Sequence, residues 1–314
     1  MRRYVFGPLR SCNTRARYAE FLVLEDDSEG DNTSQLQAPG LTRPHPALAV
    51  RGRSHPRHLS ERTRVLTRIQ QYLRAVTPIG REHERVGPFL ATFDPHSDNP
   101  YLNYAMPDDG AEPSDYEVAM LVDAYARRHR RPRLEYIPDC APAIEQALLA
   151  GGFSVEGRLL VMATDARQLG AGPEPQGIEL RIPTTDDELY GMAVVQAEAY
   201  DEPGVPSRDI VARRRAALAD GALAVVAVDR TTGAVVGAGS CSPVSDGLAE
   251  VAAIGVSVTY RRRGIGGALA TCLGREALSA GADVPWLMAA HDSERRIYER
   301  AGYRVIGEIL HISR

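Results

Sequence analysis

The stretch from Ser257 to Gly274, SVTYRRRGIGGALATCLG, places three consecutive arginines against a glycine-rich turn. The turn leads directly into an apolar pattern with helical spacing. Glycines let a backbone approach a ligand closely, and a helix start offers N–H groups without intrahelical partners at the positive end of the helix dipole. With the arginines, this turn suits an anion such as a pyrophosphate. A solvated basic face beside a plain turn is the alternative.

Two known phosphate-binding loops do not fit this stretch. The P-loop requires a Gly-Lys-Ser/Thr sequence, and the chain contains no lysine. The dinucleotide fingerprint G-x-G-x-x-G requires a glycine at position 269, where this chain has Leu269. That fingerprint also follows a parallel strand, whereas the strands expected before this turn form an antiparallel meander.

The elements that must position the turn are predicted between residues 178 and 314. A strand (178–182) and two helices (184–200 and 207–220) precede three antiparallel strands joined by DRTTG and SDG. After the glycine turn and its helix come a strand (284–290), a helix (292–302) and a last strand (303–313). Thr caps and acidic first-turn residues favour the first of these helices.

The segment Arg261-Arg262-Arg263-Gly264-Ile265-Gly266 resembles the acyl-CoA-binding signature Arg/Gln-x-x-Gly-x-Gly/Ala of the GNAT superfamily of N-acetyltransferases. IYERAGY (297–303) resembles the aromatic–Glu–x–x–Gly–aromatic ending of that family. The element order from Leu248 onward is also similar. The resemblance covers residues 178–314 well and residues 60–163 faintly. It implies an α/β (α+β) fold, with a mixed, largely antiparallel GNAT-type sheet flanked by helices, in two similar domains.

The resemblance implies a reaction and its residues. Acetyl-CoA would be the co-substrate, without a metal, and the acceptor a primary amine. A small molecule is favoured over a protein as acceptor because the sequence shows no peptide-docking feature. The amine must lose a proton, which Glu250 would accept as general base; a solvated edge-strand glutamate is the alternative. Tyr298 would protonate the thiolate, or else be a core tyrosine. The backbone N–H of Val256 would stabilise the oxyanion. The implied acyl-CoA-binding residues are Val256, Ser257, Val258, Arg261, Arg262, Arg263, Gly264, Ile265, Gly266, Gly267 and Ala268.

Composition limits the other possibilities. The net charge of -4 over 314 residues gives no bulk electrostatic attraction to nucleic acid. The four cysteines lie far apart, which argues against a zinc site or a disulfide framework and favours a reduced cytoplasm. No apolar run approaches the length of a membrane helix. We therefore expect a cytoplasmic protein without nucleic-acid or membrane partners, and the oligomeric state stays open.

The chain divides at composition changes. Residues 1–59 are acidic, then basic and proline-rich, and are expected to form an unstructured extension, with a possible short strand near Phe21–Leu24. A first domain (60–168) and a second (178–314) are joined by the linker LGAGPEPQG. ALLAGGFSVEGRLLV aligns with IYERAGYRVIGEILH, so the domains look like distant repeats. The first domain lacks the signature and has Leu148 where the second has Tyr298. It is therefore expected to be degenerate.

Three further expectations concern the second domain. YDEPGVPSRD (200–209) is a candidate acceptor loop, and the basic run in VARRRAALAD is expected to be a solvated helix face. His291-Asp292-Ser293 is given no catalytic role, although Ser293 could cap the following helix. The alternative functions are a non-catalytic acyl-CoA sensor and an acetyltransferase of protein amino groups.

Overall fold

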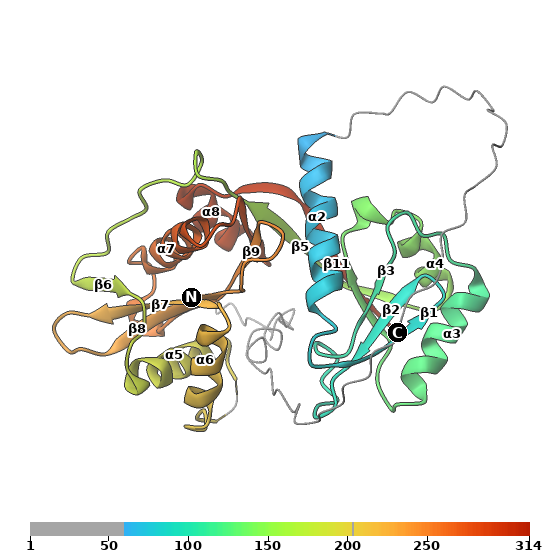
Figure 1. Ribbon diagram of the computed structural model, residues 1–314, viewed down its shortest axis with the longest axis horizontal. Coiled ribbons are helices and arrows are strands. Elements are labelled where there is room, and N and C mark those ends of the chain that lie inside the picture. The colour runs from blue at the N-terminus through green and yellow to red at the C-terminus, as the bar shows by residue number, and fades with distance from the viewer. Residues whose placement is uncertain (1–59, 203) are drawn as a thin grey trace, which may run out of the picture.

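The computed structural model describes residues 60–202 and 204–314. The predictions for residues 1–59 lie outside these ranges. The described chain forms one 11-stranded sheet in the order β1-β2-β3-β4-β11-β5-β10-β9-β8-β7-β6, with helices on both faces (Figure 1). Its parallel pairs are β3–β4 and β9–β10, and the other neighbours are antiparallel. The expected mixed, largely antiparallel sheet flanked by helices is thus confirmed.

The elements before the linker are α2 (Glu61–Val76), β1 (Glu82–Val86), β2 (Phe89–Phe93), β3 (Ala105–Pro107), α3 (Asp115–Ala126), β4 (Arg133–Tyr136), η1 (Pro138–Cys140), α4 (Ile144–Ala150) and β5 (Ser154–Ala163). Those after it are β6 (Ile178–Arg181), α5 (Asp186–Ala199), α6 (Ile210–Ala219), β7 (Leu223–Asp229), β8 (Val235–Cys241), β9 (Leu248–Val256), η2 (Val258–Tyr260), α7 (Ile265–Ser279), β10 (Val284–Ala289), α8 (Asp292–Ala301) and β11 (Arg304–Ser313).

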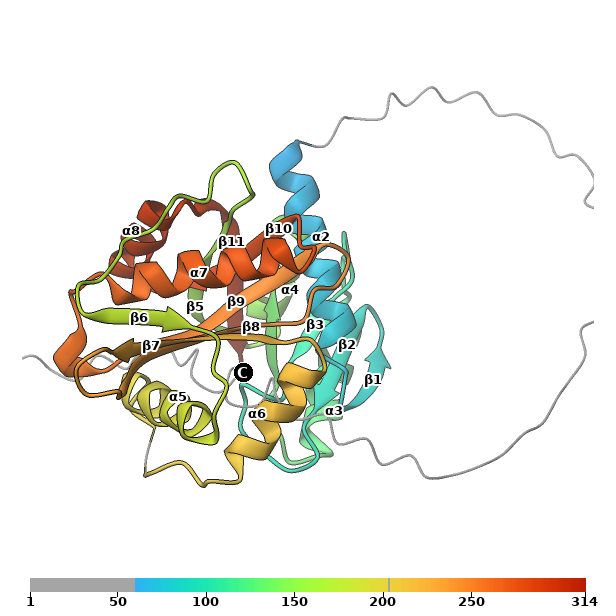
Figure 2. The same ribbon diagram turned by 60° about the vertical axis from the view of Figure 1, so that its left-hand side comes forward.

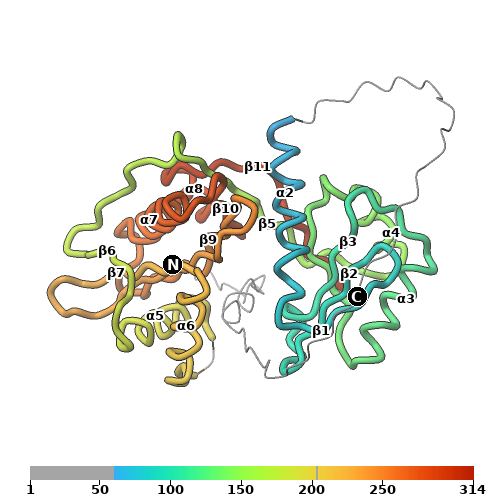
Figure 3. The backbone as a smooth tube through the Cα atoms, in the orientation of Figure 1, coloured from blue at the N-terminus to red at the C-terminus, as the bar shows by residue number. Residues whose placement is uncertain are grey.

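The order of elements repeats along the chain. Strands β1-β2-β3, helix α3, strand β4, helix α4 and strand β5 are matched in order by β7-β8-β9, α7, β10, α8 and β11. Each half, however, has the last strand of the other half inserted beside it: β11 lies between β4 and β5, and β5 lies between β10 and β11. The two long strands run antiparallel through the middle of the molecule (Figure 3). The sheet therefore does not break at the linker.

Two apolar layers enclose the strands of the C-terminal half. Alternate residues of β7 face opposite sides, as a strand requires: Val225 and Ala227 pack under α7, whereas Ala224 and Val226 pack under α5. Figure 2 shows α7 on one side of β7 and β8, with α5 and α6 on the other. In the N-terminal half, α3 and α4 cover one face and α2 covers part of the other.

Local sequence explains the helix starts. Ser60 accepts a hydrogen bond from the Thr63 N–H at the start of α2 and so caps this helix. Ser114 and Thr185 begin α3 and α5 with complete capping boxes. Ser293, which the sequence offered as a possible cap, does not cap α8. The cap position is His291, and the Ala290 N–H donates to Glu294.

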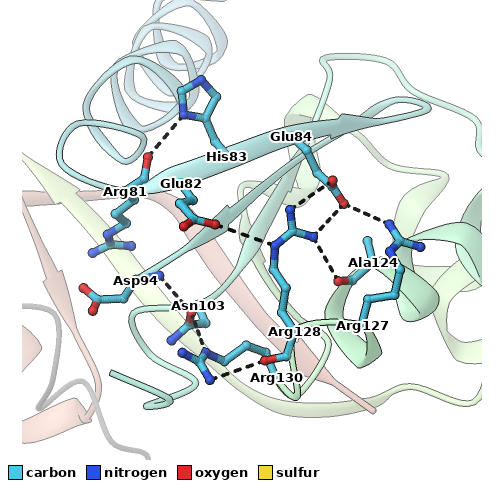
Figure 4. Close-up of polar contacts among 10 residues, drawn as sticks. All are labelled: Arg81, Glu82, His83, Glu84, Asp94, Asn103, Ala124, Arg127, Arg128 and Arg130. Atoms are coloured by element: carbon cyan, nitrogen blue, oxygen red, sulfur yellow. Dashed lines mark hydrogen bonds and ion pairs between the residues drawn. The ribbon is translucent and has the colours of Figure 1, made fainter. Parts of the chain in front are cut away.

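The outer edge of the N-terminal half carries strand β1, which the sequence analysis missed. Its side chains Glu82 and Glu84 pair with Arg128 and Arg127 at the end of α3 (Figure 4). The guanidinium carbon of Arg128 also lies 4.0 Å from the centroid of the Phe93 ring. Polar, charged residues hide the usual apolar alternation of a strand, and they also protect a sheet edge from pairing with other chains.

Candidate active site

The glycine turn forms the start of α7 as predicted. Gly264 is the N-cap residue with a φ of 82°, a left-handed conformation that disfavours any residue with a Cβ. Within the described residues no side chain caps this helix start, so its first N–H groups are not satisfied by the helix or by such a cap. A Cβ added at Gly266 would meet no atom of these residues within 4 Å. The helix start therefore offers donors beside open space, which suits a phosphate group.

The three arginines of the turn are all exposed. The Arg261 Nε donates to the Val256 carbonyl over 3.1 Å, which ties the turn to the end of β9. The Arg263 guanidinium lies 4.9 Å from the Tyr260 ring centroid and donates to the Gln176 carbonyl over 3.5 Å. Arg261 and Arg263 are thus tied to neighbouring segments, and contact of the three arginines with phosphate stays a prediction.

A carboxylate fixes the segment between β9 and the turn. Glu198 Oε1 on α5 accepts hydrogen bonds from the Val258 N–H (2.9 Å) and the Ser257 hydroxyl (3.2 Å). On the other side, the Tyr260 hydroxyl donates to Asp229 over 2.9 Å. Both contacts come from elements outside the signature, so the signature alone does not hold this segment in place.

Strands β9 and β10 separate part-way along. They pair in parallel from Leu248 opposite Val284 to Glu250 opposite Trp286, and β9 then continues to Val256 paired only with β8. The β8–β9 register slips between Ala238 and Ser240, where two β9 residues, Ala253 and Ile254, oppose one β8 residue. This β-bulge bends the strand. The result is a length of β9 whose second backbone edge does not pair with a neighbouring strand.

The bulged strand turns particular N–H groups toward that open edge. The Ser257 N–H donates to the Val236 carbonyl of β8 over 2.9 Å. Because backbone groups alternate along a strand, the Val256 N–H faces away from β8, toward the side from which β10 has separated. Val256 was the expected oxyanion donor, and its orientation agrees with that expectation; the role itself stays a prediction.

Glu250 lies at the last pair before the strands separate. The residue is 1% exposed, and its backbone N–H donates to the Ser242 hydroxyl over 2.9 Å. Burial, and secondarily the Glu250 carboxylate, raises the pKa of the Cys241 thiol far above its usual range. Glu250 is therefore a buried carboxylate rather than a solvated edge residue, and that alternative is wrong.

Tyr298 lies on α8 (Asp292–Ala301) and is a partly buried residue packed against the core cluster under α7. Its ring meets Tyr303 edge-on, with centroids 6.4 Å apart. Burial raises the pKa of Tyr298 well above that of free tyrosine, and the nearby Glu294 carboxylate and Tyr200 raise it further. The phenol consequently stays protonated throughout the neutral range, where its hydroxyl is available as a proton donor.

Three side chains that the motif did not reveal hold the bulge of β9. Gln196 Nε2 donates to the Ala253 carbonyl over 2.7 Å, and the Tyr200 hydroxyl donates to the Ile254 carbonyl over 3.2 Å. Arg214, in the run expected to be a solvated face, is instead only 6% exposed and donates to Gln196. The solvated-face expectation holds for its exposed neighbours Arg213 and Arg215 and is wrong for Arg214. A three-residue run cannot reveal which member faces the core, since successive helical residues point about 100° apart.

The N-terminal half differs at the corresponding helix start. Helix α3 begins at Ser114, whose hydroxyl accepts from the Glu117 N–H while the Glu117 carboxylate accepts from the Ser114 N–H. Asp115 adds a further negative charge to the first turn. This start is both capped and acidic, so it is unsuited to phosphate. Leu148, aligned with Tyr298, is a fully buried core residue.

Comparisons with known proteins agree with this geometry. Residues 189–303 match the acetyltransferase (GNAT) family. The C-terminal half is a GNAT domain. Mycothiol acetyltransferases from Mycobacterium sp. strains JLS and MCS are 34% identical over 140 residues, covering 44% of this chain and 45% of each relative. This chain thus matches about half the length of these curated relatives.

Solved structures extend the likeness to the fold of both halves. A GCN5-related N-acetyltransferase from Kribbella flavida aligns over 81% of this chain and 95% of its own, with a TM-score of 0.65 and 21% identity. A tandem GNAT protein from the clavulanic acid biosynthesis pathway aligns over 76% and 86%, with a TM-score of 0.55 and 15% identity. At these identities the likeness is one of fold. The GNAT sheet thus continues beyond the segment that matches the family.

No group of three or more His, Cys, Asp or Glu side chains in residues 60–202 and 204–314 is arranged to hold a metal ion. Among the helices of the same ranges, none combines the length and apolar character needed to cross a bilayer.

Proposed function

We propose that the GNAT domain transfers an acetyl group from acetyl-CoA to the primary amine of a small molecule. The observation that carries this proposal is the separation of β9 from β10 directly before the uncapped glycine start of α7. The start of α7 offers hydrogen-bond donors for a pyrophosphate. The open edge of β9 offers backbone groups to the rest of the same extended molecule. An acyl-CoA has both parts.

The binding residues follow from the signature and the geometry. The N–H groups at the start of α7 and the exposed arginines would hold the phosphates. Pantetheine would extend along the open edge of β9 toward the bulge. The residues assigned to this surface are Val256, Ser257, Val258, Arg261, Arg262, Arg263, Gly264, Ile265, Gly266, Gly267 and Ala268.

The chemistry requires an ammonium to lose two protons and the thiolate to gain one. An alkyl ammonium has a pKa of about 10, so a base is needed to give the neutral nucleophile. Glu250 accepts that proton, directly or through water. The amine nitrogen attacks the thioester carbon, the Val256 N–H stabilises the oxyanion, and the C–S bond breaks as the intermediate collapses. Tyr298 donates its proton to the departing sulfur, and the nitrogen, which loses its second proton as the amide forms, returns a proton to the tyrosinate.

Two observations bear on the acceptor. The relatives named mycothiol acetyltransferases carry the name of a thiol compound rather than of a protein, which favours a small molecule. The loop of residues 200–209 adjoins the bulge through Tyr200 and contains Asp201 and Glu202, whose charges suit a cationic amine. Residues 60–168 would form a GNAT-like domain that has lost its phosphate site and its tyrosine, joined to the catalytic domain of residues 178–314. The tandem neighbour supports that division.

The proposal is tested with purified full-length protein, acetyl-CoA and a panel of small amines, by following thiol release. Turnover that depends on both acetyl-CoA and an amine is expected. Glu250→Gln should lower kcat about 100-fold or more, because a positioned general base contributes roughly that factor, while acetyl-CoA affinity stays close to wild type. Tight acetyl-CoA binding without turnover across the panel would favour a sensor, and turnover only with peptides would favour a protein acetyltransferase.

A further inference from the structure

Arg214 is a buried cation in a position that the proposed reaction does not explain. It lies on α6 between two exposed arginines, and it is 6% exposed. Burial lowers the pKa of its guanidinium to about 10, although the nearby Glu202 opposes that shift. The group therefore remains charged at neutral pH. Burying a charge is costly unless a specific contact compensates for it, so its partner is informative.

That partner is the side-chain amide of Gln196 on α5. Arg214 Nη2 donates to Gln196 Oε1 over 2.7 Å. A guanidinium can only donate, so this contact requires the amide oxygen to face Arg214 and the amide nitrogen to face the other way. Gln196 Nε2 then donates to the Ala253 carbonyl over 2.7 Å. The charge on α6 thus fixes which end of the amide meets β9.

The backbone at that contact is strained. Ala253 has a φ of 52°, in the left-handed region that a residue with a Cβ disfavours by about 1–2 kcal/mol. It lies in the bulge, and α5 packs close behind it: a Cβ on Gly255 would lie 3.2 Å from Gln196 Cα and 3.0 Å from Ala199 Cβ. The Tyr200 hydroxyl holds the next carbonyl, that of Ile254. Helix α5 and its C-cap residue Tyr200 therefore hold two successive carbonyls of the bulge.

The direction of the N–H groups after a bulge depends on the conformation of the bulged residue. Val256, the proposed oxyanion donor, lies three residues beyond Ala253 on the same strand. We propose that Arg214 and Gln196 are positioning residues: they hold the Ala253 carbonyl and thereby aim the N–H groups beyond it at the thioester carbonyl. This inference rests on the proposed function, since it assumes that an acyl-CoA lies along β9.

Matched variants test separately the two contacts of this relay, from Arg214 to Gln196 and from Gln196 to the Ala253 carbonyl. Gln196→Glu keeps the shape of the side chain and its contact with Arg214, but a carboxylate has no N–H to offer the Ala253 carbonyl. Arg214→Met removes the donor that orients the amide, whereas Arg214→Lys keeps a donor. Arg215→Met is the control, because Arg215 is an exposed neighbour on the same helix and pairs with Asp186. Circular dichroism and thermal unfolding select the variants that are folded.

Two measurements do not require turnover. The first is the carbonyl stretching frequency of bound acetyl-CoA labelled with ¹³C at the thioester carbon, since hydrogen bonds to that oxygen lower the frequency. The second is the ratio of affinities for acetyl-CoA and for CoA, which lacks the carbonyl. In Gln196→Glu and Arg214→Met we expect the frequency to return toward its value in water and the preference for acetyl-CoA to be lost, while CoA affinity changes less than threefold.

Turnover gives the third measurement. Loss of a properly aimed oxyanion donor should lower kcat about tenfold or more in both variants, with KM for acetyl-CoA nearly unchanged, since removing such a donor outright costs about 10²–10³. Arg214→Lys should recover part of that loss, and Arg215→Met should match wild type. Folded variants with the wild-type carbonyl frequency and kcat would overturn the relay.

Failure of the proposed function gives a different pattern. The wild-type protein could bind acetyl-CoA with a lowered carbonyl frequency but transfer no acetyl group to any amine. That result would contradict the proposed enzyme activity. The positioning role of Arg214 and Gln196 would still stand if Gln196→Glu and Arg214→Met abolished the lowering of the frequency. A wild-type protein that binds neither acetyl-CoA nor CoA overturns both proposals.

Discussion

Ile312 on β11 lies directly opposite Leu134 on β4, and both side chains are fully buried in the core beneath α3 and α4. The chain reaches Ile312 only after passing through the whole C-terminal half. A residue near the C-terminus is thus part of the core of the N-terminal half. The two halves are consequently coupled through their last strands as well as through the linker.

Replacing Ile312 with alanine tests this coupling. We expect a loss of about 2–4 kcal/mol in the free energy of unfolding, the usual cost of truncating a buried isoleucine. Urea unfolding gives that value, and amide exchange should show the loss of protection at β4. Val305→Ala is the control on the same strand, since Val305 is 42% exposed and should cost about 0.5 kcal/mol. Unchanged exchange at β4 in Ile312→Ala would contradict the coupling.

The glycines at the start of α7 separate folding from binding. Gly266→Ala should leave the free energy of unfolding unchanged or slightly raised, because the added Cβ meets no atom and alanine favours a helix. It should nevertheless weaken acetyl-CoA binding about tenfold or more, by filling space at the proposed phosphate site. Gly264→Ala should lower stability as well, by about 1–2 kcal/mol, because its φ is 82°. Calorimetry and urea unfolding measure the two effects, and wild-type affinity in Gly266→Ala would argue against the phosphate site.

Tyr298 and Tyr303 form a matched pair for the proton-donor role. Tyr298→Phe should lower kcat about tenfold to 100-fold without changing acetyl-CoA affinity, since only the departing thiolate loses its donor. Tyr303→Phe loses a buried hydrogen bond to the Ala270 carbonyl, so it should cost about 1 kcal/mol of stability and leave kcat near wild type. Stopped-flow thiol release and thermal unfolding distinguish them. Equal kcat in both variants would remove the role of Tyr298.

The environment of Glu188 at the start of α5 should make the free energy of unfolding depend on pH. Burial raises the pKa of Glu188, but hydrogen bonds from the Thr184 and Thr185 backbone and from Arg181 outweigh that effect and lower the pKa to about 2. In the unfolded chain the Glu188 carboxyl has a pKa of about 4.3. Between about pH 2 and this value the unfolded state therefore binds more protons at Glu188 than the folded state does. The stabilisation is therefore complete above about pH 5 and is lost as the pH falls toward 2.

Glu188→Gln should accordingly cost about 1–2 kcal/mol at pH 7, the range for a charged capping hydrogen bond. The gap between the two proteins should narrow as the pH is lowered from about 5 to 3, because the wild-type carboxylate becomes protonated in the unfolded state. Urea midpoints across this range measure it. A gap that stays constant with pH would show that the charge of Glu188 contributes nothing.

Local patterns predicted the elements around the proposed site well. The meander β7-β8-β9, the uncapped glycine start of α7 and the helix–glycine–strand endings at Gly152 and Gly302, both with positive φ, follow from short-range rules of turns and helix ends. Strand β1 was missed because its charged side chains carry no apolar alternation. Strand β3 is limited to Ala105–Pro107, since the Asn103 side chain holds the preceding loop with three hydrogen bonds.

The sequence by itself determined the chemistry of the signature: which backbone can be left-handed, which helix start lacks a cap and which residue types surround it. Those properties depend on neighbours within a few residues. Only the tertiary structure decided that β5 and β11 exchange places and that Arg214, rather than Arg213 or Arg215, is buried against Gln196. It also decided the separation of β9 from β10. These features depend on contacts between residues far apart in the chain, and burial at such contacts depends on which faces the folded sheet and helices bring together.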